Sequence, residues 1–195
     1  MTDTSLGILE PALRGLGALL EAGGERYWLL VVGGVAINLR QVRQRVTGDV
    51  DVIARAERMP DGRAVLFRPE PFPEPLQRAI RQVAADFGLP VDWMNAEIGR
   101  MWDQGLPPWI AEDVSWHDYG GLQLGVAGRR TLVALKLWAA VDQGPRSVHA
   151  QDLLSLAPSD EELEDAARWV GEQDAAPEFG VQLRQAMAYV SDHRR

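Results

Sequence analysis

The sequence predicts an α/β fold, with a mixed β-sheet flanked by helices and followed by a C-terminal helical region. Three observations support this prediction. Leucines recur every three or four positions over residues 5–22, which is the pattern of an amphipathic helix. Residues 27–32 are continuously apolar, as in a strand that is buried on both faces. From Arg129 onward the apolar residues have helical spacing, which predicts an all-α region.

Glycines and other turn residues divide the first part of the chain into short elements. Gly23-Gly24 ends the first helix, and Gly33-Gly34 ends the apolar strand. A short helix is expected over residues 35–42, and Thr47-Gly48 marks a turn into a second strand over residues 49–54. The expected order is therefore helix, strand, turn, helix, strand.

The middle of the chain alternates between irregular and regular segments. Residues 55–73 contain four prolines and are predicted to form an irregular loop. Residues 74–87 have helical spacing and end at a glycine, which favours a helix followed by a short strand over 90–94. Residues 114–126 alternate around Gly120-Gly121 and predict a β-hairpin.

The last third of the chain is expected to be helical. Ser159 and Glu162 have the spacing of a capping box, in which each side chain satisfies a backbone N–H at a helix start. A domain boundary is expected near residue 127, with a core over 1–127 and a helical region over 128–195 that packs on it. Beyond the helix that starts at Arg129, three helices are expected, at about 147–156, 159–173 and 178–192.

Composition excludes several classes of site. The chain has no cysteine, which excludes thiolate zinc sites and cysteine nucleophiles, and its three histidines are too scattered to form a zinc ligand set. Any metal must therefore be held by oxygen atoms. The formal net charge of −8 argues against a protein that coats nucleic acid or an anionic membrane, because such binding needs a basic surface.

The hydropathy pattern favours a globular cytoplasmic protein. Hydrophobic residues make up 46% of the 195 residues and charged residues 25%, close to average soluble usage. No segment approaches the roughly 18 consecutive apolar residues of a transmembrane helix. The N-terminal segment carries an early acidic residue and Pro11, unlike a secretory signal peptide.

Two carboxylates in the second predicted strand are candidate metal ligands. Side chains alternate along a strand, so Asp49 and Asp51 are expected on one face, with Val50 and Val52 on the other. Neighbouring carboxylates repel each other unless a cation compensates, and a hard divalent ion such as Mg²⁺ prefers oxygen ligands. The alternative is a strand with a solvated acidic face.

The Gly33-Gly34 pair is a candidate phosphate-binding turn. Glycines between a strand and a helix let backbone N–H groups approach a phosphate, although such a pair is more often only a tight turn. Neither the P-loop nor the Rossmann glycine pattern is present. The carboxylates follow about fifteen residues later, and the two motifs together predict a site for a metal-bound triphosphate.

The segments VVGGVAINL and RVTGDVDVI resemble the glycine-pair and Asp-hydrophobic-Asp signature of the polymerase-beta-like nucleotidyltransferase superfamily. The resemblance is closest to its minimal and AbiEii-type bacterial branch. It implies a nucleotidyltransferase fold in which Gly33-Gly34 binds nucleotide phosphates and Asp49 and Asp51 bind one or two Mg²⁺ ions. It also implies a third carboxylate from a later strand, and Asp92 in PVDWMN is the candidate; the alternative for Asp92 is a turn carboxylate at the end of a strand.

The resemblance extends to LVALKLWA and QDLLSL, where it implies that Lys136 and Asp152 line the nucleotide site. The alternatives are a surface lysine whose stem is buried and an aspartate that serves a helix N-terminus. Arg45 is a further candidate, because its guanidinium could bind phosphate or balance Asp49. One residue departs from the family: many members have Ser or Thr after the glycine pair, whereas this chain has Val35.

The expected function is Mg²⁺-dependent transfer of a nucleoside monophosphate from an NTP such as ATP to an acceptor. Acceptors in the resembling branch include protein side chains, RNA ends and small molecules, and some members are toxins of toxin–antitoxin pairs, so an antitoxin is a candidate partner. Two alternatives remain open. One is a catalytically silent module that keeps the fold, which Val35 favours. The other is a metal-dependent phosphohydrolase.

Overall fold

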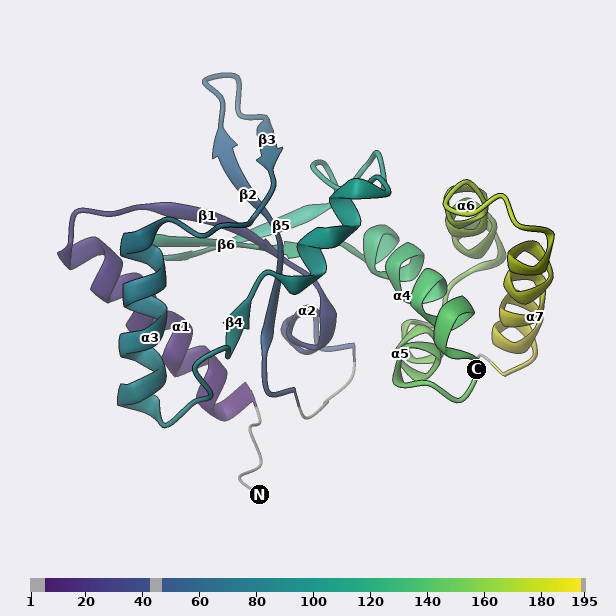
Figure 1. The fold of residues 1–195 in the computed structure, drawn as a ribbon, viewed down its shortest axis with the longest axis horizontal. Helices are drawn as coiled ribbons and strands as arrows, with labels where there is room; N and C mark the ends of the chain where they lie inside the picture. The colour runs from purple at the N-terminus through teal and green to yellow at the C-terminus, as the bar shows by residue number, and fades with distance from the viewer. Residues whose placement is uncertain (1–5, 43–46, 194–195) are drawn as a thin grey trace. The chain divides into compact units, whose positions relative to one another are not determined.

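The computed structural model describes residues 6–42 and 47–193, and the chain divides into two compact units (Figure 1). The first unit comprises Met1–Asp103 and Val114–Ala127, and the second comprises Gln104–Asp113 and Gly128–Arg195. The sequence places the boundary near residue 127, whereas in the structure Gln104–Asp113 groups with the helical unit.

A mixed β-sheet forms the centre of the first unit, as the sequence predicts. The strand order is β3-β2-β1-β6-β5, and β4 pairs with β2 outside this path. Strand β1 is parallel to β6 and antiparallel to β2, and the short β4 is parallel to β2. The six strands are β1 (Tyr27–Val31), β2 (Val50–Arg58), β3 (Ala64–Phe67), β4 (Met94–Asn95), β5 (Val114–Tyr119) and β6 (Leu122–Ala127).

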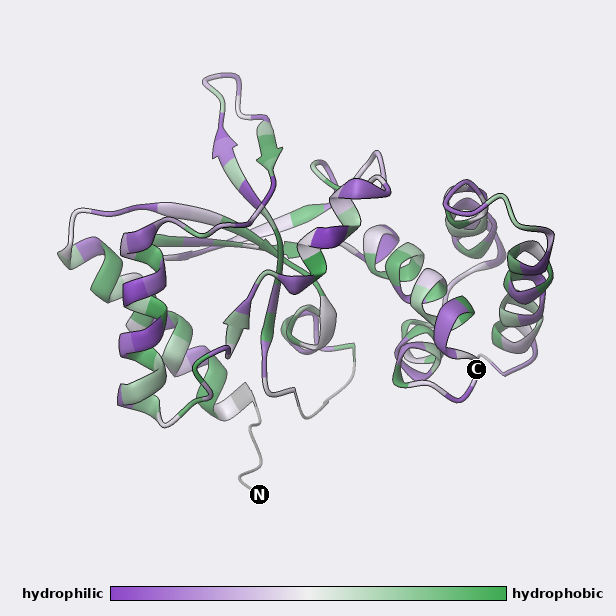
Figure 2. Cartoon of the chain, viewed as in Figure 1, coloured by the Kyte–Doolittle hydropathy of each residue, from purple (hydrophilic) through white to green (hydrophobic). Residues whose placement is uncertain are grey.

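Helices α1 (Leu6–Ala22) and α3 (Glu74–Phe87) pack side by side, and α1 also contacts β5 and β6 (Figure 1). The leucines at positions 9, 13 and 16 are fully buried on α1, as an amphipathic helix requires. Helix α3 shows alternating hydrophobic and hydrophilic bands in Figure 2, and all of its buried residues are apolar. The apolar spacing therefore predicts both helices and the faces that they bury.

Two sequence-based predictions about the strands are wrong. Residues 55–73 do not form one irregular loop, because β2 continues to Arg58 and pairs with β3 in antiparallel register. Residues 90–94 do not form a strand, because the backbone N–H of Trp93 donates to the carbonyl of Pro90 at 3.0 Å and closes a turn. Only Met94 and the following residue are extended.

Two short elements complete the first unit. Helix α2 (Gly33–Leu39) begins two residues before its predicted start at 35 and ends three residues before its predicted end at 42. A 3-10 helix, η1 (Glu97–Asp103), follows β4 and lies against β2.

The second unit consists of α-helices around α4 (Arg129–Gln143), which contacts the other three. Trp138 and Trp169 meet edge to face in this core, with ring centroids 5.5 Å apart. The Ser159 hydroxyl and the Glu162 carboxylate form the predicted capping box. The other helices are α5 (Val148–Leu156), α6 (Asp160–Gly171) and α7 (Pro177–His193).

Residues 104–113 belong to the helical unit because they hold the start of α4. The Asp113 carboxylate accepts a hydrogen bond from the Thr131 backbone N–H at 2.7 Å, and the Asp113 carbonyl accepts one from Gly128 at 2.6 Å. The Arg130 guanidinium lies 3.9 Å from the ring centroid of Trp109. Within the described parts of the chain, no helix combines the length and the apolar content that crossing a membrane requires.

Candidate functional site

The turn between β1 and α2 is fitted to the Asp51 carboxylate. Gly33 has a φ of +70°, in the left-handed region that favours glycine. A Cβ atom at position 33 would collide with Oδ2 of Asp51. The Val32 backbone N–H also donates to the Asp51 carbonyl at 3.0 Å. A glycine is therefore required at position 33 for its backbone conformation and for the space that Asp51 occupies.

An irregularity in the sheet lies just before this turn. Leu30 pairs with Ala54, but Val31 pairs with Val52, so β2 contains one extra residue, Ile53. The Ile53 carbonyl accepts a hydrogen bond from the indole N–H of Trp102 at 2.7 Å. A β-bulge bends its strand and re-aims the neighbouring side chains. The bulge thus lies between the regular part of the sheet and the segment that carries the two aspartates.

Asp49 and Asp51 differ in their surroundings. Val50 and Val52 are fully buried, whereas Asp49 is exposed and Asp51 is half-buried, as the predicted alternation requires. Asp49 precedes β2 and does not begin it, which corrects the predicted strand start by one residue. The carboxylates are thus on the polar side of this segment, where oxygen ligands can bind a hard cation.

Thr47 is a residue that the sequence analysis did not assign to the site. Its side chain is buried, and its hydroxyl lies 3.2 Å from Oδ1 and 3.3 Å from the carbonyl oxygen of Asp49. These contacts fix the backbone and the carboxylate of Asp49 relative to each other. Its place two residues before Asp49, inside the segment RVTGDVDVI that carries the family resemblance, is the signal that could have identified it.

The position beside Asp51 on the next strand belongs to Asn95, not to Asp92. Strands β2 and β4 are parallel and pair Asp51 with Asn95. Asp92 is exposed and lies in the turn before β4. Among the described residues, no three His, Cys, Asp or Glu side chains form a group that could hold a metal ion. The structure therefore does not bring Asp92 together with Asp49 and Asp51 as the predicted carboxylate triad.

Asn95 was missed because strand register is a tertiary property. Its Oδ1 atom accepts a hydrogen bond from the Glu97 backbone N–H at 3.1 Å, which fixes the orientation of the amide. Paired residues on neighbouring strands present their side chains on the same face of a sheet. Asn95 therefore adds a neutral oxygen-bearing side chain beside Asp51 where the sequence predicts a carboxylate.

Val35 lies in the core of the first unit. Its exposed fraction is 0%, and the two residues that follow it in α2 are also fully buried. Val32, which precedes the helix, makes no side-chain capping hydrogen bond. In this arrangement the backbone amides of the turn are the groups that can contact a phosphate, and the side chain at position 35 serves packing.

The predicted basic ligand Arg45 lies outside the described residues. Arg40, five residues before it, is described. Its Nε–H donates to the Ala127 carbonyl at 2.6 Å, and its guanidinium also reaches the Ser115 hydroxyl at 3.3 Å. Arg40 therefore ties the end of α2 to strands β5 and β6.

Lys136 and Asp152 form a buried ion pair inside the second unit. The Lys136 Nζ atom lies 2.8 Å from Asp152 Oδ2, and the two side chains are 5% and 0% exposed. Nζ also lies 3.5 Å from Nδ1 of His149. Removal of one partner from a buried pair leaves an uncompensated charge and costs about 3–5 kcal/mol. The pair joins α4 to α5, and its role in binding nucleotide stays a prediction.

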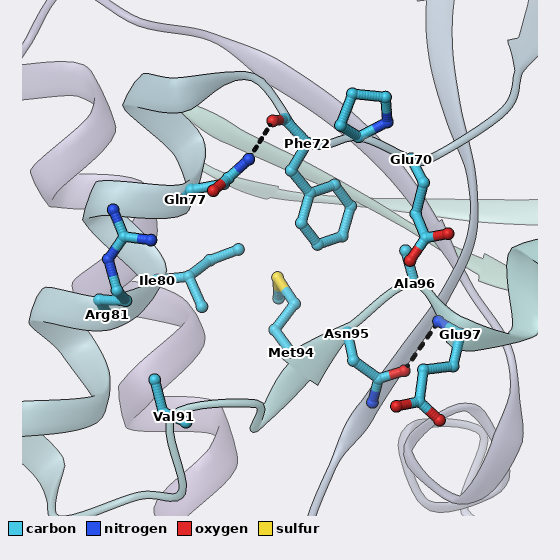
Figure 3. A pocket seen from close by; sticks show the side chains of 11 residues that line it. Glu70, Phe72, Gln77, Ile80, Arg81, Val91, Met94, Asn95, Ala96 and Glu97 are labelled. Atoms are coloured by element: carbon cyan, nitrogen blue, oxygen red, sulfur yellow. Dashed lines mark hydrogen bonds between the residues drawn. The ribbon is translucent and has the colours of Figure 1, made fainter.

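A cavity of about 650 Å³ opens within the first unit beside Asn95 (Figure 3). It lies between α3, the segment that precedes α3, and the residues around β4.

A comparison of the chain with protein-family models, curated proteins and solved structures finds no match in any of the three.

Proposed function

We propose that the first unit catalyses Mg²⁺-dependent transfer of a nucleoside monophosphate from an NTP to an acceptor hydroxyl. The observation that carries this proposal is the contact between the Gly33 turn and the Asp51 carboxylate. A turn of backbone N–H groups suits phosphates, and carboxylates suit the divalent ion that accompanies a triphosphate. Their direct contact supports a site in which the phosphates and the metal ion would bind side by side.

The residues have separate roles in this mechanism. The backbone amides at the start of α2 bind the phosphates, and the Asp49 and Asp51 carboxylates would hold Mg²⁺. When bound, Mg²⁺ neutralises the charge that develops on the phosphoryl oxygens. One carboxylate accepts the proton of the acceptor hydroxyl while the acceptor oxygen forms its bond to the α-phosphorus. The bond between the α-phosphorus and the bridging oxygen breaks, and pyrophosphate leaves with the electron pair.

A catalytically silent nucleotide-binding module is the second candidate function. One observation favours it: Asn95 occupies the register position beside Asp51, so this position supplies an amide and not a carboxylate. An amide oxygen can coordinate a cation but cannot accept a proton as a general base at neutral pH. In this alternative the turn and the aspartates bind a nucleotide without transferring it.

The deciding experiment combines binding and transfer. The purified protein is incubated with Mg²⁺ and each α-labelled NTP in the presence of a cell extract, and labelled products are separated. Asp49→Asn and Asp51→Asn should each reduce labelling by on the order of 100-fold or more, because each removes a metal ligand. Asp61→Asn is the matched control, since Asp61 lies in the turn between β2 and β3 and pairs with Arg63.

Three outcomes separate the hypotheses. Labelling that depends on Asp49 and Asp51 supports the transferase. Nucleotide binding without labelling supports the silent module. No binding of any NTP in the presence of Mg²⁺ contradicts both.

A further inference from the structure

The cavity beside Asn95 has an apolar interior and a charged rim. Phe72, Ile80 and Met94 provide the apolar walls, and Ile80 and Met94 are buried. A volume of about 650 Å³ is within the range of pockets that bind small molecules.

The cavity and the Gly33 turn lie on opposite edges of β2. Strand β1, which leads into the turn, pairs with one edge of β2, and β4 pairs with the other edge beside Asp51. Asn95 belongs both to β4 and to the cavity lining. Asp51 therefore lies between the turn and Asn95 of the cavity lining.

This order agrees with the geometry of phosphoryl transfer. The attacking and leaving oxygens lie roughly in line on opposite sides of the phosphorus. If the turn binds the leaving pyrophosphate, the acceptor enters from the opposite side of the aspartates, where the cavity lies. The inference that follows rests on the proposed function.

The charges on the rim indicate the kind of acceptor. In Figure 3 the Glu70 and Glu97 side chains lie on the Asn95 side of the cavity, and Arg81 lies on the opposite side. The edge nearest the aspartates is therefore acidic. An RNA end or another phosphorylated acceptor would bring negative charge against these carboxylates, whereas an ammonium group would be attracted to them.

Hydrogen bonds within the wall hold the cavity in shape. The Gln77 side-chain amide donates to the Phe72 carbonyl at 2.7 Å, and the Asn95 amide accepts from the Glu97 backbone N–H at 3.1 Å. The two bonds tie the segment before α3 and the segment after β4 into their positions (Figure 3). A cavity with a fixed wall loses less entropy when a ligand binds.

We propose that this cavity binds the acceptor, and that the acceptor is a small molecule with a hydroxyl group, an apolar body and an ammonium group. The apolar body contacts Phe72, Ile80 and Met94. The ammonium group pairs with Glu70 and Glu97. The hydroxyl group points past Asn95 toward Asp51.

The test uses three probes that differ only near their charge, measured by saturation-transfer NMR without nucleotide. The probes are 2-amino-1-phenylethanol, which is cationic, 1-phenylethanol, which is neutral, and mandelate, which is anionic. The cation should bind about fivefold more tightly than the neutral alcohol, and mandelate should bind most weakly, because one exposed ion pair contributes about that factor. Glu70→Gln with Glu97→Gln should abolish this preference, whereas Glu57→Gln, an exposed residue of β2 outside the cavity, should keep it.

The same probes separate this inference from the proposed function. Equal binding of 2-amino-1-phenylethanol and mandelate, or a preference that survives both glutamine substitutions, overturns the inference. Label that passes from an α-labelled NTP to 2-amino-1-phenylethanol supports the inference and the proposed function together. A cation preference in a protein that labels no acceptor contradicts the proposed function but supports the ligand class of the cavity.

Discussion

The Asp51 carboxylate occupies the space that a side chain at Gly33 would need. The two residues lie 18 positions apart in the sequence, on different elements, and the bulge at Ile53 separates Asp51 from the regular part of β2. The turn and the carboxylate therefore depend on each other, which makes Gly33 the most direct test of the site.

Gly33→Ala is expected to destabilise the protein and to weaken nucleotide binding. The substitution adds the strain of a left-handed alanine, about 1 kcal/mol, and a collision with Asp51, which together cost about 3 kcal/mol. Gly24→Ala is the matched control, because Gly24 has a φ of +72° and no atom within 4 Å of the added Cβ. Urea unfolding followed by circular dichroism measures both variants. Equal losses of stability in Gly33→Ala and Gly24→Ala would mean that the Asp51 carboxylate does not exclude a side chain at position 33.

Asn95→Asp is expected to create a third carboxylate beside Asp51. Like charges opposite each other on neighbouring strands repel, so the melting temperature should fall without Mg²⁺ and recover when Mg²⁺ is added. Mn²⁺ binding, followed by electron paramagnetic resonance, should become several-fold tighter. Asp92→Asn should leave both measurements unchanged, because Asp92 lies in an exposed turn. A loss of Mn²⁺ binding in Asp92→Asn would show that Asp92 is a metal ligand after all.

Val35→Thr is expected to destabilise the protein without tightening nucleotide binding. Position 35 is fully buried, so the new hydroxyl would enter the core, at a cost of about 1–3 kcal/mol if it finds no partner. Val35→Ala provides a comparison that removes volume without adding a polar atom. Isothermal titration with Mg²⁺ and ATP measures affinity beside the urea unfolding. Tighter ATP binding in Val35→Thr would show that the hydroxyl reaches the phosphates.

Lys136→Met is expected to lower the free energy of unfolding of the helical unit by about 3–5 kcal/mol, because it leaves the buried Asp152 carboxylate without its cation. Lys136→Met with Asp152→Leu should recover most of that loss, since both charges are then absent. Arg78→Met, which breaks an exposed pair with Glu74 on α3, should cost about 0.5 kcal/mol or less. Failure of the double variant to recover stability would point to a requirement for the ion pair beyond charge balance.

Glu162→Gln is expected to make the free energy of unfolding depend less on pH in the acidic range. The hydrogen bond from Arg129 lowers the pKa of Glu162, so its stabilisation is complete above its unfolded pKa near 4.5 and is lost as the pH falls through the lower folded value. At pH 7 the variant should lose about 1 kcal/mol, and it should approach the parent protein once the pH lies below the folded pKa of Glu162. Urea unfolding across this range measures the difference, with Glu161→Gln as the control from the same helix turn. A constant difference at all pH values would exclude the proposed linkage.

The periodic elements could be predicted from sequence because their signals are local. The leucine spacing of α1, the apolar run of β1 and the Ser159–Glu162 capping box all depend on residues within one or two turns of each other. The extent of β2 and the existence of β3 could not be predicted, because their pairing satisfies backbone groups in a segment whose prolines indicate a loop. In this segment the hydrogen bonds between β2 and β3 therefore outweigh the local preference of its residues for a loop.

Some residues of the candidate site could likewise be predicted from the sequence, whereas others depend on the tertiary structure. Gly33-Gly34, Asp49 and Asp51 could be named from sequence because their residue types and spacing carry the chemistry. The partner of Asp51 could not, because Asp92 and Asn95 lie three residues apart in one segment and only the register with β2 places Asn95 beside it. Likewise, the pairing of Lys136 with Asp152 depends on how α4 packs against α5.

The sequence by itself determined the α/β class, the helical last third and the glycine and aspartate positions, because periodicity and residue chemistry are properties of the chain alone. Tertiary structure decided that Asp51 fits against Gly33, that Val35 packs in the core, and that a cavity with an acidic edge opens beside Asn95. These relationships depend on strand register and packing between residues distant in sequence, and no local pattern encodes them.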